Sequence, residues 1–385
     1  MTESVQLVNQ QEQLTSICQT LKASDRIAID LEFDKNYYRY GFNLCLMQLF
    51  DGETCYLIDP LSQSMKIETI FPILVDSSIE KVAFAFGEDL RLLHKIGCFP
   101  KNVYDLDNAI SLLNYSPASL TNHLENILDI KTGQSKQMSN WYERPLSDQQ
   151  IVYATEDVKY LFMLHDRLKK ESEEKNVAKW INEENRAALQ EDHSSNGNVS
   201  GVKHKHKKQF TEWEWHIYTR LMETREQLSE TLDRPAFKVI KEDVLMEIAK
   251  DHQKLNRWSN TRGIHRRLKS EKMKQKMKAV LEEAIEEAEK LGLSDTDPAD
   301  KPLSPEERNE RRVLRERVNK AKSELFNPIK EKIEQDYGKE VSTFLFSNRI
   351  IGDIIADDDH TMLSYKEELL RDYANQLNID ISKYI

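Results

Sequence analysis

The sequence contains little cysteine and no long apolar stretch. Four cysteines, Cys18, Cys45, Cys55 and Cys98, occur among 385 residues, and none has the CxxC spacing of a zinc or redox motif. This pattern excludes a disulfide-stapled fold, so we expect reduced thiols and a cytoplasmic protein. No apolar run reaches the length that a bilayer requires, and the first residues are polar. We therefore expect neither a signal peptide nor a membrane partner.

The sequence also lacks an excess of positive charge, since 55 basic and 66 acidic residues give a net charge of −11. Taken alone, this charge argues against nucleic acid as a partner. The charges are unevenly distributed, however, and one window is strongly basic. Its basic residues are Lys250, Lys254, Arg257, Arg262, Arg266, Arg267, Lys269, Lys272, Lys274, Lys276 and Lys278, with only Asp251 and Glu271 as acids. Local charge is therefore a better guide to partners than the total.

Two polar segments divide the chain, which is too long for one typical core and predicts two or three domains. Small polar residues followed by a basic run indicate one linker, and a segment rich in serine, aspartate and proline indicates another. We predict a first domain over residues 1–192, a linker over 193–209, a helical domain over 210–292, a linker over 293–303 and a helical C-terminal domain over 304–385.

The first domain has the pattern of an α/β fold. Apolar runs predict strands over residues 26–33, 44–50 and 55–58, and Asp51-Gly52 predicts a hairpin between the last two. Helices then alternate with short strands at residues 81–85 and 103–104. This order predicts a mixed sheet with flanking helices, whereas the chain after residue 210 is helical throughout.

Acidic side chains stand at three separated places in the first domain. Asp30 and Glu32 lie two residues apart on a strand and therefore point to the same face. Asp89 begins a helix, and Tyr153 precedes Asp157 by one helical turn. Clustered carboxylates suit hard divalent cations such as Mg²⁺, and a pair of such ions can clamp both oxygens that react at a phosphodiester.

Each of these acidic positions has an ordinary explanation when taken alone. Acids on an edge strand are usually solvated, an acid at a helix start complements the helix dipole, and a tyrosine one turn before an aspartate can be an exposed face. Their combination in this order indicates a nuclease.

The surrounding sequence resembles the DEDD exonuclease superfamily, and most of all the ribonuclease D family, over about residues 25–170. The likeness includes Met47–Glu53, Leu57–Leu61 and Trp141–Leu146, and a tyrosine four residues before the last aspartate, Tyr153, is typical of the DEDDy branch. The resemblance implies a ribonuclease H-like fold that removes nucleotides from the 3′ end.

The resemblance assigns the catalytic residues. Asp30, Glu32, Asp89 and Asp157 would hold two Mg²⁺ or Mn²⁺ ions, and such ions lower the pKa of a bound water and neutralise charge on the phosphate. Tyr153 would orient that water. A phenol with a pKa of ~10 is a poor base at neutral pH, so we expect it to position the water and not to deprotonate it.

Two positions depart from the family pattern. Relatives often carry a histidine where this chain has Phe84-Ala85-Phe86, and a threonine where Leu106 follows Asp105. Neither position belongs to the four metal-binding acids, so we expect the difference to concern substrate contacts or local packing.

Residues 210–292 resemble an HRDC domain, a helical nucleic-acid-binding module found in ribonuclease D and RecQ-type helicases. The likeness rests on Arg234–Ile240, Val244–Ala249 and Gly263. Its position makes the segment 304–385 a candidate for a diverged second module of this kind.

Five basic residues are candidates for contact with nucleic acid. Arg262, Arg266 and Arg267 lie in the basic window, where phosphate contacts would weaken as salt rises. Lys136 and Arg144 lie just before the third motif. A solvated helix face explains the charges of the basic window equally well.

These inferences predict a metal-dependent 3′–5′ exoribonuclease that trims structured RNA such as tRNA precursors and releases nucleoside 5′-monophosphates. One alternative is a 3′–5′ exonuclease on single-stranded DNA, because the metal site itself does not sense the 2′-hydroxyl. Another is an inactive nucleic-acid-binding protein. Four mutually repelling acids argue against the inactive protein, since binding gives no reason to hold them together.

Overall fold

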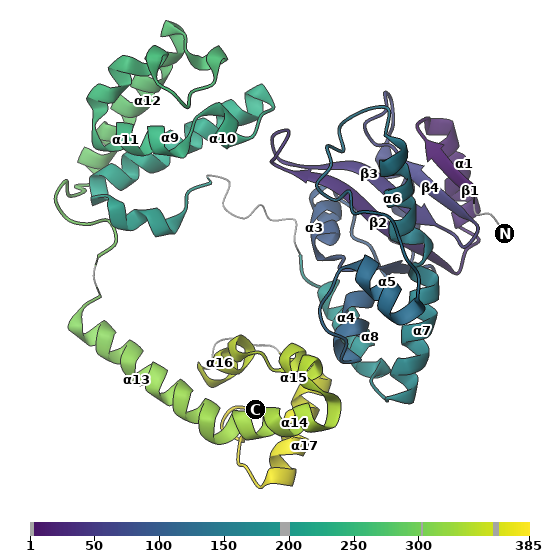
Figure 1. Cartoon of the computed structure of the whole chain (residues 1–385). Coiled ribbons are helices and arrows are strands. Elements are labelled where there is room, and N and C mark those ends of the chain that lie inside the picture. Colours follow the sequence, from purple (N-terminus) through teal and green to yellow (C-terminus); the bar gives the residue numbers. More distant parts are fainter. Residues whose placement is uncertain (1–3, 193–200, 302, 357–361) are drawn as a thin grey trace. The chain divides into compact units, whose positions relative to one another are not determined.

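The computed structural model describes residues 4–192, 201–301, 303–356 and 362–385. The chain forms two compact units, one of residues 1–32, 44–194 and 305–385 and one of residues 33–43 and 195–304 (Figure 1). Within the described part of the chain, no helix combines the length and the apolar character needed to cross a membrane.

A six-stranded mixed sheet forms the centre of the first unit, with the strand order β1–β4–β3–β2–β5–β6. The strands are β1 (Ser4–Val8), β2 (Arg26–Lys35), β3 (Phe42–Phe50), β4 (Thr54–Ile58), β5 (Glu80–Ala83) and β6 (Val103–Asp105). Strands β1 and β4, β2 and β5, and β5 and β6 pair in parallel, whereas β3 and β4 are antiparallel. The predicted α/β domain with a mixed sheet is confirmed.

Strand β1 is an element that the sequence pattern did not indicate. It lies at one edge of the sheet, where Val5 and Leu7 remain 48% and 40% exposed and only Val8 is fully buried. Because an edge strand buries so little, its alternation of apolar and polar residues is weak. By contrast, the central strand β2 buries Ile27 and Ile29 as its sequence predicts.

Helices flank the sheet on the first unit, and α6 runs across it (Figure 1). The helices of this part are α1 (Gln11–Leu21), α2 (Phe71–Leu74), α3 (Gly87–Lys95), α4 (Leu106–Leu112), α5 (Leu120–Leu128), α6 (Asp148–Lys159), α7 (Leu161–Glu174) and α8 (Ala178–Ala188). Helix α6 starts with the capping box that the sequence predicts, because Ser147 Oγ accepts from the Gln150 N–H at 3.3 Å and Gln150 Oε1 accepts from the Ser147 N–H at 3.1 Å. Ala154 and Val158 are fully buried on one side of α6. This buried side determines which way the other side chains of α6 point.

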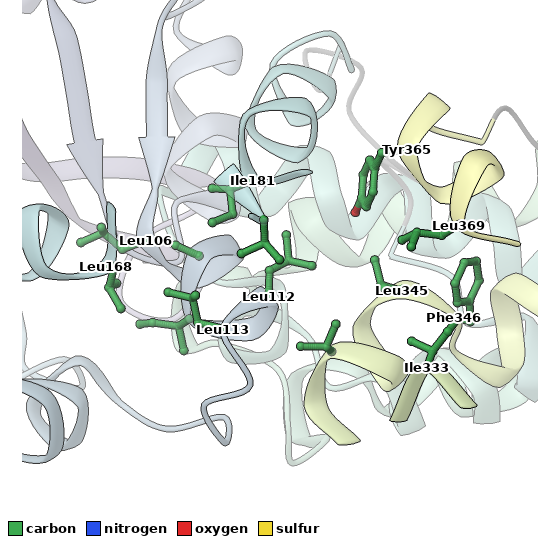
Figure 2. Close-up of a cluster of buried hydrophobic side chains, with 14 of the residues drawn as sticks. Leu106, Leu112, Leu113, Leu168, Ile181, Ile333, Leu345, Phe346, Tyr365 and Leu369 are labelled. Atoms are coloured by element: carbon green, nitrogen blue, oxygen red, sulfur yellow. The ribbon is translucent and has the colours of Figure 1, made fainter. Parts of the chain in front are cut away.

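The C-terminal helices share a hydrophobic core with the helices beside the sheet. They are α13 (Pro305–Ala321), α14 (Asn327–Tyr337), α15 (Lys339–Leu345), α16 (Asn348–Ala356) and α17 (Ser364–Leu377), with a π-helical stretch at Lys322–Phe326. Figure 2 shows that Leu112 and Ile181, from α4 and α8, belong to the same buried cluster as Leu345 and Tyr365, from α15 and α17. No sequence pattern indicated this shared core, because it joins residues far apart in the chain.

Polar contacts join the same two parts. The N–H of Glu340 donates to Asn114 Oδ1 at 3.0 Å, the Tyr365 hydroxyl donates to Glu184, and Lys366 Nζ lies 2.7 Å from the Glu184 carboxylate. The last of these pairs is shielded from water, since the two side chains are 12% and 14% exposed. The C-terminal helices are therefore part of the first compact unit.

Over its described residues 201–301, the second unit is built from helices joined by irregular segments. It contains α9 (Glu212–Leu232), α10 (Ala236–Val239), α11 (Glu242–Lys250) and α12 (Glu271–Lys290), with a 3₁₀ stretch at His252–Asn260. Trp258 is fully buried at its centre and donates its indole N–H to the Leu268 carbonyl at 2.7 Å. Gly263 adopts a φ of +89°, which explains why the turn there carries a glycine. The helical character predicted for residues 210–292 is confirmed.

Candidate functional site

Three carboxylates from two distant elements meet on the first unit. Strand β2 supplies Asp30 and Glu32, and α6 supplies Asp157, and one oxygen of each lies within 4.8 Å of the others. Glu32 is 6% exposed. The side-chain alternation of the strand and the buried side of α6 thus direct acids that are more than 120 residues apart to one place.

Asp89, from the first turn of α3, lies near enough to these acids for its charge to act on two of them. Its side chain is 7% exposed, and its charge helps to raise the pKa values of both Asp30 and Glu32. Among the residues that the structure describes, its Oδ1 is buried without a hydrogen-bond partner. A buried carboxylate oxygen with no donor is unusual, and a cation is a suitable partner for it.

The four acids disfavour their own ionisation. Burial is the largest cause of the raised pKa of each acid, and for Asp30 and Glu32 the charges of Asp157 and Asp89 come next. The pKa of Asp89 rises to about 8 and that of Asp157 to about 7. Divalent cations would compensate this crowded negative charge, and oxygen donors of this kind are the ligands that Mg²⁺ and Mn²⁺ prefer. The residues present therefore fit a site for divalent cations.

Tyr153 stands at the edge of this cluster with its hydroxyl on Asp157. Its hydrogen bond to that carboxylate lowers the pKa of Asp157 in part, against the larger effect of burial. Burial, followed by the charge of Asp157, raises the pKa of Tyr153 itself above its ordinary value. The tyrosine therefore stays a phenol and acts as a hydrogen-bond donor at neutral pH.

Two neighbours of the cluster were missed in the sequence. Gln48 on β3 is fully buried and donates from Nε2 to Glu32 Oε1 at 3.5 Å, and Ser135 forms a hydrogen bond with Tyr153. Gln48 is a polar residue within the apolar run of β3, and this exception was the signal in the sequence that could have identified it. Ser135 lies in an irregular segment, where no periodicity marks a functional position.

Arg144 does not have the free guanidinium that a substrate contact requires. Nε and Nη2 donate to Asp59 at 2.6 and 2.8 Å, Nη2 also donates to the Cys45 carbonyl at 2.8 Å, and Nη1 donates to the carbonyls of Trp141 and Glu143, each at 2.8 Å. All five N–H donors of the side chain are thereby used. Arg144 thus joins the segment before α6 to Asp59, the residue after β4. We therefore no longer propose Arg144 as a phosphate contact.

The other basic candidates lie at the surface. Lys136 lines an open pocket of about 310 Å³ together with Val152 and Tyr153. Arg262, Arg266 and Arg267 are exposed in the second unit. Lys136 thus shares a pocket with Tyr153, and the three arginines lie on the surface of the second unit.

Comparison with known proteins identifies what this arrangement resembles. A family model for 3′–5′ exonucleases matches residues 5–173. The ribonuclease D of Bartonella henselae is 29% identical over 250 residues, which are 64% of this chain and 61% of that protein. The ribonuclease D of Zymomonas mobilis is 33% identical over 181 residues, 46% of each chain. The exosome complex exonuclease RRP6 of Saccharomyces cerevisiae is 31% identical over 170 residues, 44% of this chain and 23% of that protein. The chain thus matches less than two thirds of the length of these relatives.

Solved structures show the same fold. The crystal structure of Escherichia coli ribonuclease D matches with a TM-score of 0.68 at 21% identity, covering 98% of this chain and 99% of that one. A protein from Bifidobacterium adolescentis matches with a TM-score of 0.72 at 17% identity, covering 97% and 99%. The predicted fold and the resemblance to ribonuclease D are confirmed.

Proposed function

We propose, on the premise that residues 5–173 are a 3′–5′ exonuclease domain of the ribonuclease D type, that this protein is a metal-dependent 3′–5′ exoribonuclease. The observation that carries the proposal is the convergence of Asp30, Glu32 and Asp157 to within 4.8 Å, with Asp89 and Tyr153 beside them. A protein of this fold that only bound nucleic acid would gain nothing from buried acids that repel each other.

The four carboxylates would hold two divalent cations, Mg²⁺ or Mn²⁺. Such ions, when bound, lower the pKa of a water and stabilise the charge that develops on a phosphodiester. The chain supplies the rest. The hydrogen bonds of Tyr153 to Asp157 and Ser135 hold its hydroxyl in one orientation, from which it would direct the attacking water. Because Tyr153 stays protonated, we assign it to positioning and not to proton removal.

The substrate we propose is RNA with a structured body and a free 3′ end, such as a tRNA precursor, in the cytoplasm. The relatives in sequence are named ribonuclease D, and the E. coli protein of the same fold is described as an exoribonuclease involved in structured RNA processing. Lys136, in the pocket that Tyr153 also lines, and Arg262, Arg266 and Arg267, on an HRDC-type domain of residues 210–292, would contact phosphates. Removal of one nucleotide at a time would release nucleoside 5′-monophosphates.

The test is a nuclease assay with two 5′-labelled substrates, a tRNA with a 3′ extension and a single-stranded DNA of similar length. The protein is incubated with Mg²⁺ or Mn²⁺, and EDTA serves as the metal-free control. Asp30→Asn removes one acid while keeping its size. Asp129→Asn is the matched control, because Asp129 is exposed at the end of α5 with a φ of +59°, a conformation that asparagine also adopts readily.

A metal-dependent ladder on RNA that disappears in Asp30→Asn and persists in Asp129→Asn supports the proposal. A ladder on DNA alone identifies a deoxyribonuclease. Binding of both substrates without cleavage by the wild-type protein identifies an inactive binding protein.

A further inference from the structure

The carboxylate of Asp105 binds three backbone N–H groups from two different segments. At the end of β6, its Oδ1 accepts from the N–H of Ala85 at 2.8 Å and from that of Asp107 at 3.0 Å, and its Oδ2 accepts from the N–H of Phe86 at 2.8 Å. The bond to Asp107 caps the start of α4. The other two bonds reach across to the turn between β5 and α3, so one side chain ties two elements together.

That turn leads directly into the helix that carries Asp89. Ala85 adopts a φ of +52°, a left-handed conformation that is uncommon for a residue with a side chain. Phe86 follows as the N-cap of α3 and supplies no side-chain cap. Asp89 lies in the first turn of the same helix. The backbone therefore turns sharply just before the helix that carries Asp89. The Asp105 carboxylate accepts hydrogen bonds from two N–H groups of this turn.

The chemistry of Asp105 suits a supporting role better than a simple helix cap. A serine or threonine would cap α4 with its single hydroxyl oxygen. The Asp105 side chain accepts three N–H bonds, one more than the two lone pairs of a hydroxyl oxygen can accept. Its negative charge also helps to raise the pKa of Asp89, after the larger effect of burial. The Asp105 carboxylate therefore lies close enough to repel the charge of Asp89. Capping α4 alone does not explain why a charged residue occupies this position.

We propose that Asp105 is a positioning residue of the acid cluster, which holds the Ala85–Phe86 turn so that the Asp89 carboxylate meets the other three acids. Asp105 does not bind the cation. It acts through the backbone of the turn, as supporting groups do for metal ligands in other proteins. This inference rests on the proposed function only in that the four acids are taken to bind divalent cations.

The test measures Mn²⁺ binding to the whole protein without substrate, by electron paramagnetic resonance of the free ion. In Asp105→Ser the hydroxyl keeps the cap of α4 but is too short and has too few acceptors to hold the turn. We expect its Mn²⁺ affinity to fall roughly 10- to 100-fold, the range found for supporting residues of metal sites. Asp105→Asn keeps the length and one acceptor oxygen, so its loss should be smaller.

Asp51→Ser is the matched control. The Asp51 carboxylate also accepts two backbone N–H bonds, from Glu53 at 2.9 Å and Thr54 at 2.8 Å. That turn joins β3 and β4 and carries none of the four acids. The control therefore makes the same substitution at an aspartate that binds a different turn, and it should leave Mn²⁺ affinity unchanged.

Wild-type affinity in Asp105→Ser would overturn the inference, as would an equal loss in Asp51→Ser or no Mn²⁺ binding by the wild-type protein. If circular dichroism shows that Asp105→Ser is unfolded, Asp105→Asn decides by the same criterion. The outcome is separate from the nuclease assay, because a wild-type protein that binds Mn²⁺ but cuts no RNA would refute the proposed function and leave the role of Asp105 standing. In an active enzyme, the rate constant kcat should fall while KM for RNA stays constant.

Discussion

Replacing Asp157 by asparagine should stabilise the metal-free protein at alkaline pH. The pKa of Asp157 rises from 3.8 to about 7, first because burial removes the carboxylate from water. Between about pH 4 and pH 7 the folded protein therefore holds a proton at Asp157 that the unfolded chain has released. At pH 8 the folded state must carry a charge that it disfavours, and asparagine removes that charge without changing the size of the side chain.

The magnitude follows from the pKa. A rise of about 3 units, at 1.36 kcal/mol per unit, corresponds to roughly 4 kcal/mol against folding at pH 8. This figure is a ceiling for the substitution, because a buried amide still needs hydrogen-bond partners that water supplied in the unfolded chain. We expect the free energy of unfolding of Asp157→Asn to exceed that of the wild type by ~1–3 kcal/mol.

The sign of the pH dependence is fixed by which state binds more protons. Between about pH 4 and pH 7 the folded protein holds a proton at Asp157 that the unfolded chain has lost, so this residue makes stability fall as pH rises. Below about pH 4 both states are protonated and the effect disappears. The advantage of Asp157→Asn should thus be near zero at pH 4, grow up to pH 7 and stay constant above it.

The assay is urea unfolding in EDTA at several pH values, followed by circular dichroism, for the wild type, Asp157→Asn and the control Asp129→Asn. Adding Mg²⁺ should then stabilise the wild type more than Asp157→Asn, because only the complete set of acids binds the ion well. An Asp157→Asn protein that is less stable than the wild type at pH 8 in EDTA, or an advantage that does not change with pH, would refute the electrostatic reasoning.

Four further outcomes are expected. Tyr153→Phe should lower kcat roughly 10- to 100-fold with unchanged RNA affinity, because it loses only the orienting hydroxyl; an unchanged kcat would remove the tyrosine from the mechanism. Arg144→Lys should cost ~2 kcal/mol of stability in thermal unfolding and leave the salt dependence of RNA binding as it is, because a lysine cannot replace five fixed donors. The double substitution of Arg266 and Arg267 by alanine should reduce the slope of log affinity against log salt by about 1 for each phosphate that the variant no longer neutralises, and an unchanged slope would mark the arginines as solvated surface. Gly338→Ala should destabilise the protein by ~1–3 kcal/mol, since its Cβ would lie 2.2 Å from the Asn114 side chain at a φ of +97°; a melting temperature equal to that of the wild type would contradict the packing of the C-terminal helices.

The local pattern of the sequence indicated the main strands and several helices, and together with the family resemblance it indicated the five proposed catalytic residues. Asp30 and Glu32 share a face because side chains alternate along a strand, and Tyr153 stands over Asp157 because the helix repeats every 3.6 residues. The start of α6 was equally local, since Ser147 and Gln150 form its cap within four residues. Such features depend on near neighbours in the chain, and their periodicity is visible in the sequence.

Contacts between distant residues were decided only by the tertiary structure. Arg144 reads as a free cation in the sequence, but its guanidinium binds Asp59, 85 residues away. The core that joins α4 to α15 and the reach of Asp105 back to the turn before Asp89 likewise leave no periodic signal. A side chain's residue type determines which bonds it can form, whereas its available partners depend on how the sheet brings separate segments together.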